Sequence, residues 1–587
     1  MAAKILATKQ REATGRTAPL TVEPPIDTLR RKLLLAQALP RSSAASLGTD
    51  QLPRAAHWPE PRTVVSAKAP ADAAKLGTKA KPLILSLTQA LQIGARNSRD
   101  YQTHKETVFR AALALDLARN EFRTTFYGFF SALGEVDRAG GDTAAGAVAS
   151  LETWVERKFK TGATMTTGIA LDLARLMAFD QASAIGILAD ASISVPLLSG
   201  SGRHIVGEPL TLAERDVLYA LYEFERFRRT YAVRVATECL DVLQQHDRIV
   251  NARENYKGLV AARRRARRLV DSGRIPGIDV DEALQDELRS RDRWVTARDA
   301  YRSRLDRFKI TLCLPTDAHV DLDHTELRRL TSGARDRLKL DTVGAPDAGP
   351  APPADTPVVL AEPTRAGAGP LELDETAAIR IALAKRLDLR VVNLVVEDAQ
   401  RAVVVAADGL RARLDLVGSA RAGSRRSTVG SATLKDASLR PDHGLYTLGL
   451  DVDLPWEKTD ERNRYRESLI ALEQAARAVQ ALEDEVKLDV REALRALAQA
   501  RESATIQAQG VVLATRRVKN TDLLLQAGRA KVRDVLFAQE SLLSAQNALT
   551  TALRNYRVAE LALQRDMGVL AITNTGLWRE YRPDEHK

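Results

Sequence analysis

The sequence has few cysteines and no long apolar segment. Among its 587 residues only Cys239 and Cys313 are cysteines, and neither has a nearby cysteine or histidine partner. A disulfide framework or a zinc site does not fit this spacing, so we expect two small buried residues. No window approaches 18 consecutive apolar residues, which excludes a transmembrane helix. Residues 1–9 also lack the apolar stretch of a signal peptide.

Aromatic residues are scarce, at 5%, whereas charged residues reach 28%. This balance suits long amphipathic helices better than a sandwich or an α/β enzyme. The net charge is +11, but residues 1–82 hold 14 Lys and Arg against 6 Asp and Glu, so this segment accounts for +8. The basic run Arg263–Arg268 has no interleaved aromatics and is expected to be a solvated helix face. We therefore predict no nucleic-acid partner.

Motifs of catalysis are missing as well. There is no Gly-rich phosphate loop, no GxSxG and no HExxH. Residues 319–324 (HVDLDH) bring metal-capable side chains together. They follow a helix-ending Leu-Pro, and a polar turn is the expected structure. The sequence thus predicts no enzyme activity, no cofactor and no metal site.

Proline marks the organisation of the chain. Residues 1–82 are rich in Pro, Ala, Ser and Lys and are expected to form an extended or disordered basic arm, with one short helix near 26–39. A second break contains the run GAPDAGPAPP. The predicted parts are the arm 1–82, a first half 83–340, a Pro/Gly/Ala linker 341–370, a second half 371–575 and a tail 576–587.

The two halves share a helix-loop-helix signature 255 residues apart. It reads GRIPGIDV at 273–280 and GRAKVRDV at 528–535, with glycine six residues before an Asp-Val pair in both copies. The starts of the halves, LSLTQA at 85–90 and LELDETA at 371–377, match at an offset of 286 to 288 instead. The first half must therefore hold about 31 to 33 extra residues between these points.

Segments with small, alternating residues lie between each start and each signature. They are predicted strands, at 124–133, 159–170, 185–195, 410–419 and 445–454. Pro196 and Pro455 close two of these segments, as expected where a sheet must stop. Downstream, no proline interrupts 210–275 or 456–582. Residues 457–526 are expected to form one helix of roughly 105 Å with a coiled-coil seam.

Short strands between such helices leave unsatisfied edges. Pairing with other copies of the chain would remove the edges, and about ten residues is the length of a membrane-spanning strand. Soluble hairpins that cap a coiled coil remain the alternative from the pattern alone.

The order of these features, present twice over residues 83–575, resembles the TolC-type outer-membrane efflux proteins. Residues 195–203 resemble the strand-to-helix turn of that family, and Leu312–Pro315 its helix end. The resemblance implies a mainly α fold with a small β part. Long helices would form a coiled-coil α-barrel, and four short strands per chain would form part of a trimeric 12-stranded transmembrane β-barrel. Residues 418–444 and 128–162 would be outward-facing loops.

The function that the resemblance implies is a passive exit duct of a tripartite efflux or type I secretion system. It would lie in the cell outer membrane, contact lipid there and extend into the periplasm. Its partners would be two further copies of the chain, a periplasmic adaptor (membrane fusion) protein that opens the helical tip, and an inner-membrane pump.

The resemblance also assigns roles to the hairpin tips. Asp534, Asp279 and Arg529 would form the periplasmic aperture or gate. Helix N-capping is the alternative role for each aspartate. The residues expected to contact the adaptor are Gly273, Arg274, Val280, Gly528, Arg529 and Val535. The chain departs from the family at three gate positions, where it has Leu525, Ala530 and Phe537.

Two classes of function remain. The first is the exit duct, and the second is a soluble structural coiled-coil or scaffold protein with no transport role. The missing signal peptide favours the second class, although a chain without its leader would look the same. The sequence does not specify a transported substrate.

Overall fold

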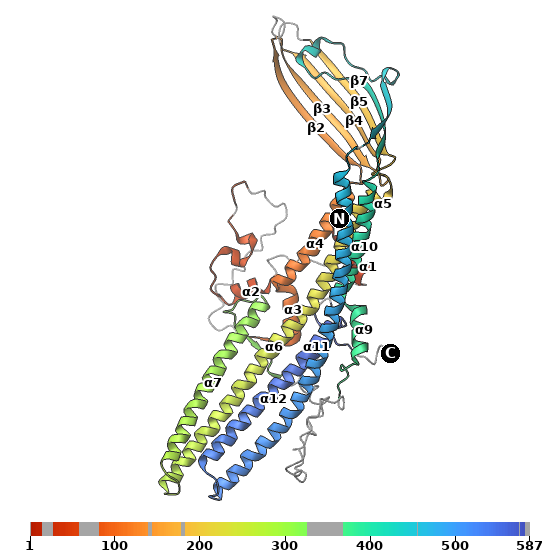
Figure 1. The fold of residues 1–587 in the computed structure, drawn as a ribbon. Helices are drawn as coiled ribbons and strands as arrows, with labels where there is room; N and C mark the ends of the chain where they lie inside the picture. Colours follow the sequence, from red (N-terminus) through yellow and green to blue (C-terminus); the bar gives the residue numbers. More distant parts are fainter. Residues whose placement is uncertain are drawn as a thin grey trace. The chain divides into compact units, whose positions relative to one another are not determined.

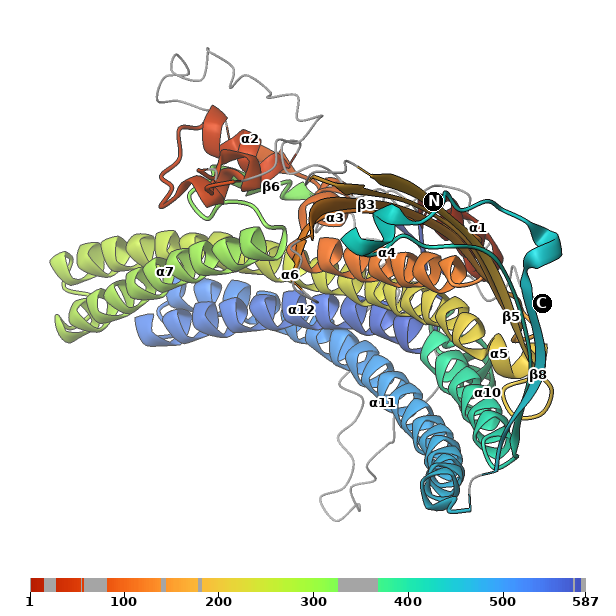
Figure 2. The same ribbon diagram turned by 90° about the horizontal axis from the view of Figure 1, so that it is seen from above.

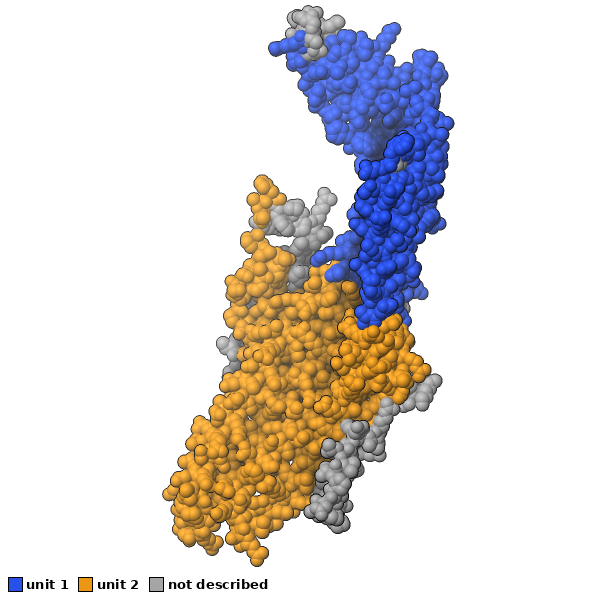
Figure 3. Space-filling model, in the orientation of Figure 1, with its two compact units in different colours: residues 1–20, 107–222, 390–481 blue, residues 21–106, 223–389, 482–587 orange. Residues whose placement is uncertain are grey.

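A computed structural model describes residues 2–14, 28–53, 55–57, 82–138, 144–177, 182–325, 368–454, 456–573 and 576–581. The chain forms two compact units, each built from both halves of the sequence (Figures 1 and 3). Unit 1 comprises residues 1–20, 107–222 and 390–481, and unit 2 comprises 21–106, 223–389 and 482–587. The predicted linker lies almost entirely outside the described residues, and the predicted domain boundaries stay predictions.

Unit 1 contains one antiparallel sheet of six strands in the order β2-β3-β4-β5-β7-β8. Its register is continuous: Leu171 of β4 lies opposite Leu151 of β3 and Ile187 of β5. Within the described part of the chain, β2 and β8 are the two unpaired edges. The strands are β2 (Thr125–Asp137), β3 (Ala144–Lys158), β4 (Thr164–Leu176), β5 (Ser183–Pro196), β7 (Arg413–Ser424) and β8 (Leu445–Asp453).

The first half contributes four of these strands and the second half two. Helices α4 (Arg99–Asn120) and α10 (Leu387–Asp408) precede β2 and β7 at an offset of 288. The long helices α6 (Glu208–Asp271) and α11 (Thr459–Gln526) end at an offset of 255. The 33 residues by which the offsets differ therefore lie in the sheet, where they form an additional hairpin.

The fold class is confirmed, because long helices carry a small antiparallel sheet. The five predicted strands correspond to β2, β4, β5, β7 and β8. The expected number of four strands per chain is wrong, since the sheet has six. Residues 128–162 are not an outward loop but contain most of β2 and all of β3. The expected total of twelve strands for a trimer rested on four strands per chain and is therefore wrong as well.

Unit 2 contains two antiparallel pairs of long helices, which lie side by side in Figures 1 and 2. α6 turns back into α7 (Ile278–Thr311), and α11 turns back into α12 (Val532–Asp566). The single long helix predicted at 457–526 is confirmed by α11, which is continuous over 68 residues. Buried side chains join α11 and α12 to α9 (Glu375–Lys385) in one core, namely Ala378, Ala382, Val486, Val490, Leu497, Tyr556 and Leu563.

Parts of the N-terminal segment are helical. α2 (Leu29–Ala36) confirms the short helix predicted near 26–39. α1 (Ala2–Thr14) departs from the extended arm that we expected. Ile5 and Leu6 of α1 are buried, and Lys9 lies 3.6 Å from Glu214 of α6. The helix α1 therefore packs through its apolar side chains.

Short elements complete the fold. Residues Val320–Leu322 form β6, which runs parallel to β1 (Leu83–Leu85) in place of the polar turn expected at 319–324. The others are α3 (Leu87–Asn97), α5 (Arg203–Val206), β9 (Ala571–Ile572) and β10 (Trp578–Arg579). Cys239 and Cys313 are both buried, as predicted. Among the described helices, none is long and apolar enough to cross a membrane.

Candidate functional sites: the hairpin tips and the sheet

The two hairpin tips turn with the same backbone geometry. Gly273 and Gly528 have φ angles of +69° and +71°. In each turn the glycine N–H donates to the carbonyl oxygen three residues earlier (2.8 and 3.0 Å), and the following arginine N–H to the one five residues earlier (2.9 and 2.8 Å). This pattern ends a helix with a residue in the left-handed region, which favours glycine. The repeated glycine is therefore explained by the turn.

The tip aspartates lie at the starts of the return helices. The carboxylate of Asp534 accepts a hydrogen bond from the backbone N–H of Lys531 at 3.0 Å, so the capping role applies to it. Asp534 and Arg529 are exposed. Asp279 is half-buried in the first turn of α7, and its own N–H donates to the carbonyl oxygen of Pro276 at 3.2 Å. The capping contact of Asp534 therefore leaves its side chain exposed at the surface.

A small apolar core joins the two tips. Its buried members are Leu259 and Ala266 of α6, Ala283 of α7, and Val532 and Leu536 of α12. Val280 and Leu525 pack against this core. Val535 is only 4% exposed. Of the predicted contact residues, Val280 and Val535 thus serve packing, whereas Arg274 and Arg529 lie on the surface.

The basic run Arg263–Arg268 is partly paired rather than simply solvated. Arg263 lies 2.8 Å from Glu287 of α7, and Arg265 lies 2.5 Å from Asp522 of α11. These ion pairs connect α6 to both neighbouring hairpin arms near the tips. The sequence pattern did not reveal the partners, because they come from helices distant along the chain.

Phe537 occupies a position where the resembling family has an aspartate. Its side chain is 57% exposed, and the Arg517 guanidinium lies 4.9 Å from its ring centroid. The contact has the geometry of a cation–π interaction between α11 and α12. An exposed aromatic ring thus lies at this point of the tip.

The sheet has two faces of different chemistry. Residues alternate between faces along a strand, and residues opposite each other on neighbouring strands share a face. The register therefore assigns Leu151, Ile169, Leu171, Ile187 and Leu450 to one side, which we call the apolar face. The carboxylates of the strands lie on the other side, the polar face: Glu135, Glu152, Glu156, Asp172, Asp190, Asp415, Asp451 and Asp453.

Large side chains on the apolar face are exposed although they are apolar. Phe126 at one edge is 77% exposed and Leu448 at the other edge is 79% exposed. Between them, Ile169 and Leu171 of β4 are each more than 40% exposed. A continuous exposed apolar surface of this kind marks contact with another apolar phase or molecule.

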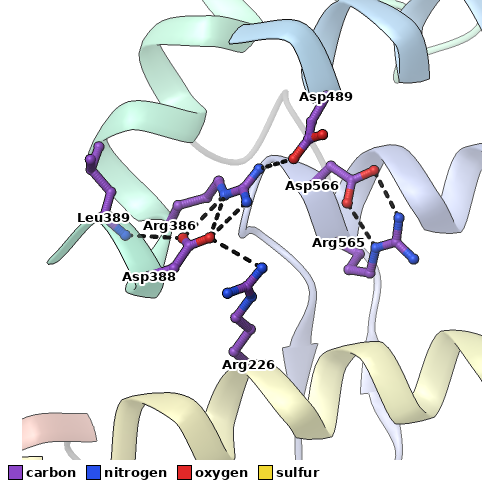
Figure 4. A network of polar contacts seen from close by, with 7 residues as sticks. All are labelled: Arg226, Arg386, Asp388, Leu389, Asp489, Arg565 and Asp566. Atoms are coloured by element: carbon purple, nitrogen blue, oxygen red, sulfur yellow. Dashed lines mark hydrogen bonds and ion pairs between the residues drawn. The ribbon is translucent and has the colours of Figure 1, made fainter. Parts of the chain in front are cut away.

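A buried polar network fixes the junction of α9 and α10 in unit 2 (Figure 4). Arg386 contacts Asp388 at 2.7 Å and Asp489 of α11 at 2.6 Å, and Arg226 of α6 lies 3.4 Å from Asp388. Burial raises the pKa of Asp388, but the hydrogen bonds and charge of Arg386 outweigh it and hold the pKa below its usual range. The charges are paired, so this network is structural.

The second half matches a known family by sequence. Residues 378–569 match the model of the outer membrane efflux protein family. The matched efflux repeat begins in α9, includes β7 and β8, and ends after α12. The first half contains the same elements in the same order, with the additional hairpin.

Solved outer-membrane channels share the fold of the chain. VceC from Vibrio cholerae has a TM-score of 0.56 and 11% identity, covering 82% of this chain and 96% of that one. CmeC from Campylobacter jejuni has a TM-score of 0.54 and 12% identity, covering 82% and 85%. MtrE from Neisseria gonorrhoeae has a TM-score of 0.52 and 13% identity, covering 82% and 89%. No curated protein matches in sequence. The resemblance to the TolC-type fold is confirmed.

Proposed function

We propose that this chain is one protomer of an exit duct in the outer membrane, for efflux or one-step secretion, which extends into the periplasm. The observation that carries the proposal is the two-faced sheet in a chain with the efflux repeat. The exposed apolar face suits contact with lipid, and the carboxylate-bearing polar face suits a water-filled lumen. In a soluble scaffold protein the apolar side chains of Phe126, Leu171 and Leu448 would be exposed to water without a function.

The two unpaired edges of the sheet can be satisfied by pairing with further copies of the chain. Unpaired strand edges do not occur in the hydrocarbon region of a bilayer, because no water satisfies their backbone groups. β2 follows a helix and β8 precedes one, so the two edge strands run in opposite directions. β8 of one copy can therefore pair antiparallel with β2 of the next. A ring of three copies with six strands each contains eighteen strands.

Fractionation tests the duct. Expressed behind a signal peptide, the chain should appear in the outer-membrane fraction as a trimer that detergent extracts intact. Cysteines placed at Phe130 and Leu448, both on the apolar face near opposite edges, should cross-link neighbouring copies into a covalent trimer. A cysteine pair at Leu171 and Leu448 is the control and should not. A soluble monomer or dimer would refute the duct and favour the scaffold protein.

The hairpin tips are proposed as the periplasmic aperture. Three copies of the exposed Asp534 would ring a narrow pore, attract cations and repel anions. Asp534→Ala should raise single-channel conductance and reduce block by multivalent cations. Asp534→Asn removes the charge but keeps an acceptor for the Lys531 N–H, so it separates charge from capping. If the alanine variant alone changes the pore, Asp534 acts through the turn and not through its charge.

The tips are also proposed to dock a periplasmic adaptor that links the duct to an inner-membrane pump. Arg274 and Arg529 are exposed there and would meet an acidic surface. Reversing both charges to glutamate should abolish co-purification of the adaptor, and added salt should weaken the wild-type complex. Unchanged binding of the double variant would remove both arginines from the docking surface.

A further inference from the structure

The segment between β7 and β8, residues 425–444, does not extend away from the sheet. In Figures 1 and 2 this teal segment lies against the ends of the strands that are farthest from the helices. Val429 and Ala432 are 0% and 2% exposed. They pack on Val148, Ala174 and Leu176, which all belong to the polar face. This β7–β8 loop therefore folds back over the polar face.

Carboxylates of that face anchor the loop. Asp172 of β4 has a fully buried side chain, and it accepts hydrogen bonds from Arg425 Nε at 2.9 Å and Nη2 at 3.1 Å. It also accepts the backbone N–H of Arg426 at 2.9 Å. Glu152 of β3 lies 2.6 Å from Arg425, and Glu135 of β2 accepts the backbone N–H of Val429 at 2.7 Å. Three neighbouring strands thus hold the loop through charge-assisted bonds.

Small residues make room for the loop. A Cβ atom on Gly186 would lie 2.7 Å from the backbone nitrogen of Arg426, and one on Gly146 would lie 2.8 Å from Val429 Cγ1. Both glycines are on the polar face by register. Gly423, with a φ of +94°, lets the chain leave β7, and a Cβ there would meet the carbonyl oxygen of Ile187. A larger residue at Gly186 would displace the loop, whereas a Cβ at Gly146 or Gly423 would first meet the strand carbonyl oxygen of Arg175 or Ile187.

The loop is tied down again before it returns. The N–H of Ala437 donates to the carbonyl oxygen of Ile185 at 2.7 Å, and the Ile185 N–H donates to Asp436 Oδ1 at 2.7 Å. These bonds use the backbone groups of β5 beyond the point where β7 ends. The loop is therefore fixed at both of its arms.

We propose that the β7–β8 loop is a constriction inside the lumen at the outer mouth of the duct, and that it sets the size of the cargo that leaves. This inference rests on the proposed function, which makes the polar face the lumen wall. Barrel diameter grows with strand number, so eighteen strands enclose a wider lumen than twelve. Three loops folded inward narrow that mouth. Asp172 is the positioning residue that holds each loop in place.

The decisive variant is Asp172→Asn, compared with Asp190→Asn. Both remove one carboxylate from the polar face, but in the described structure no bond joins exposed Asp190 to the loop. Loss of one partner of a buried ion pair lowers the equilibrium constant for the folded-over loop by on the order of 100-fold. The Asp172 variant should therefore raise the conductance of the purified trimer in planar bilayers and admit larger polyethylene glycols. Asp190→Asn should change ion selectivity only.

Access to a cysteine at Ala432 gives a second measurement. In the wild-type background Ala432→Cys should resist an impermeant maleimide, and addition of Asp172→Asn should make it react. If Asp172→Asn fails to form trimers, replacement of residues 427–435 by a short Gly-Ser segment leaves the strands intact and should open the mouth in the same way.

The outcomes separate the two proposals. If wild type forms no trimeric pore, the duct itself is refuted. If the wild-type trimer conducts and either opened variant matches the conductance and polymer exclusion of Asp190→Asn, the duct stands and the constriction is wrong.

Discussion

The assignment of the two faces predicts which charges the sheet tolerates. Leu171 lies near the middle of β4 on the apolar face, between Leu151 and Ile187, and it is 42% exposed. If this face contacts lipid, Leu171→Arg places a guanidinium near the bilayer midplane. Ser192 of β5 is exposed on the polar face, between Thr166 and Ser419. Ser192→Arg adds the same charge to the lumen wall and is the matched control.

The magnitude follows from the cost of arginine at that depth. A lipid-facing arginine at the midplane of a transmembrane barrel costs about 2 to 4 kcal/mol. A value of about 3 kcal/mol lowers the folding equilibrium constant by roughly 150-fold per chain. Three equivalent sites far apart add, which gives about 9 kcal/mol for a trimer. That sum approaches the whole stability of an ordinary domain, so Leu171→Arg should not assemble.

The assay is refolding into lipid vesicles, followed as the fraction of protein that stays trimeric on unheated gels. Wild type and Ser192→Arg should reach equal yields, and Leu171→Arg should yield almost no trimer. Circular dichroism of each variant checks that the helices have formed. Equal yields for both arginine variants, or a greater loss for Ser192→Arg, would refute the assignment of the faces.

Three further predictions concern the helices. Gly528→Ala adds a Cβ that meets no neighbouring atom but strains the left-handed backbone of the turn. It should lower the local free energy of unfolding by about 1 to 2 kcal/mol, measured as faster hydrogen exchange at that tip. Faster exchange that spreads along α12 would contradict a local effect. Gly568→Ala should cost more, because its Cβ would also lie 2.9 Å from the carbonyl oxygen of Lys385; a melting temperature equal to that of Gly528→Ala would disprove the clash. Arg386 lowers the pKa of Asp388, so this pair stabilises the fold above about pH 4 and loses its effect as the pH falls through the lowered pKa. Asp388→Asn should flatten acid unfolding in that range, and an unchanged acid profile would show that other groups control it.

The helical part of the fold could be predicted from the sequence. A proline-free, amphipathic segment has few alternatives to a helix, and α11 begins two residues after its predicted start. The tip glycines could also be located from the sequence, because each left-handed turn has a glycine at a fixed distance before an Asp-Val pair. Local rules were sufficient in both cases.

The strand β3 was missed because its pattern is weak. On its apolar face it has Ala145, Ala147 and Ala149, and alanine has little preference for strands. The signal that could have located β3 was the difference in repeat offsets, about 31 to 33 residues, which is the length of a hairpin. The offsets alone locate an insertion but do not specify its structure.

The loop anchor could not have been predicted from spacing. Arg425 and Asp172 are 253 residues apart, and their contact depends on the register of β4, β5 and β7. Val280 and Val535 show the same limit at the tips. The resemblance assigned both to adaptor contact, which stays a prediction, whereas packing between helices distant in sequence decides their burial.

The additional hairpin has a topological consequence for how this architecture can vary. Every connection from the sheet to a helix leaves from one end of the strands, so a change in strand number must come in pairs. An odd insertion would place the next helix at the other end of the sheet. The insertion in the first half is one such pair, and it changes the repeat offset from 288 before the sheet to 255 at the ends of α6 and α11. The number of strands in unit 1 can thus change in pairs, while the helix pairs of unit 2 keep their repeat.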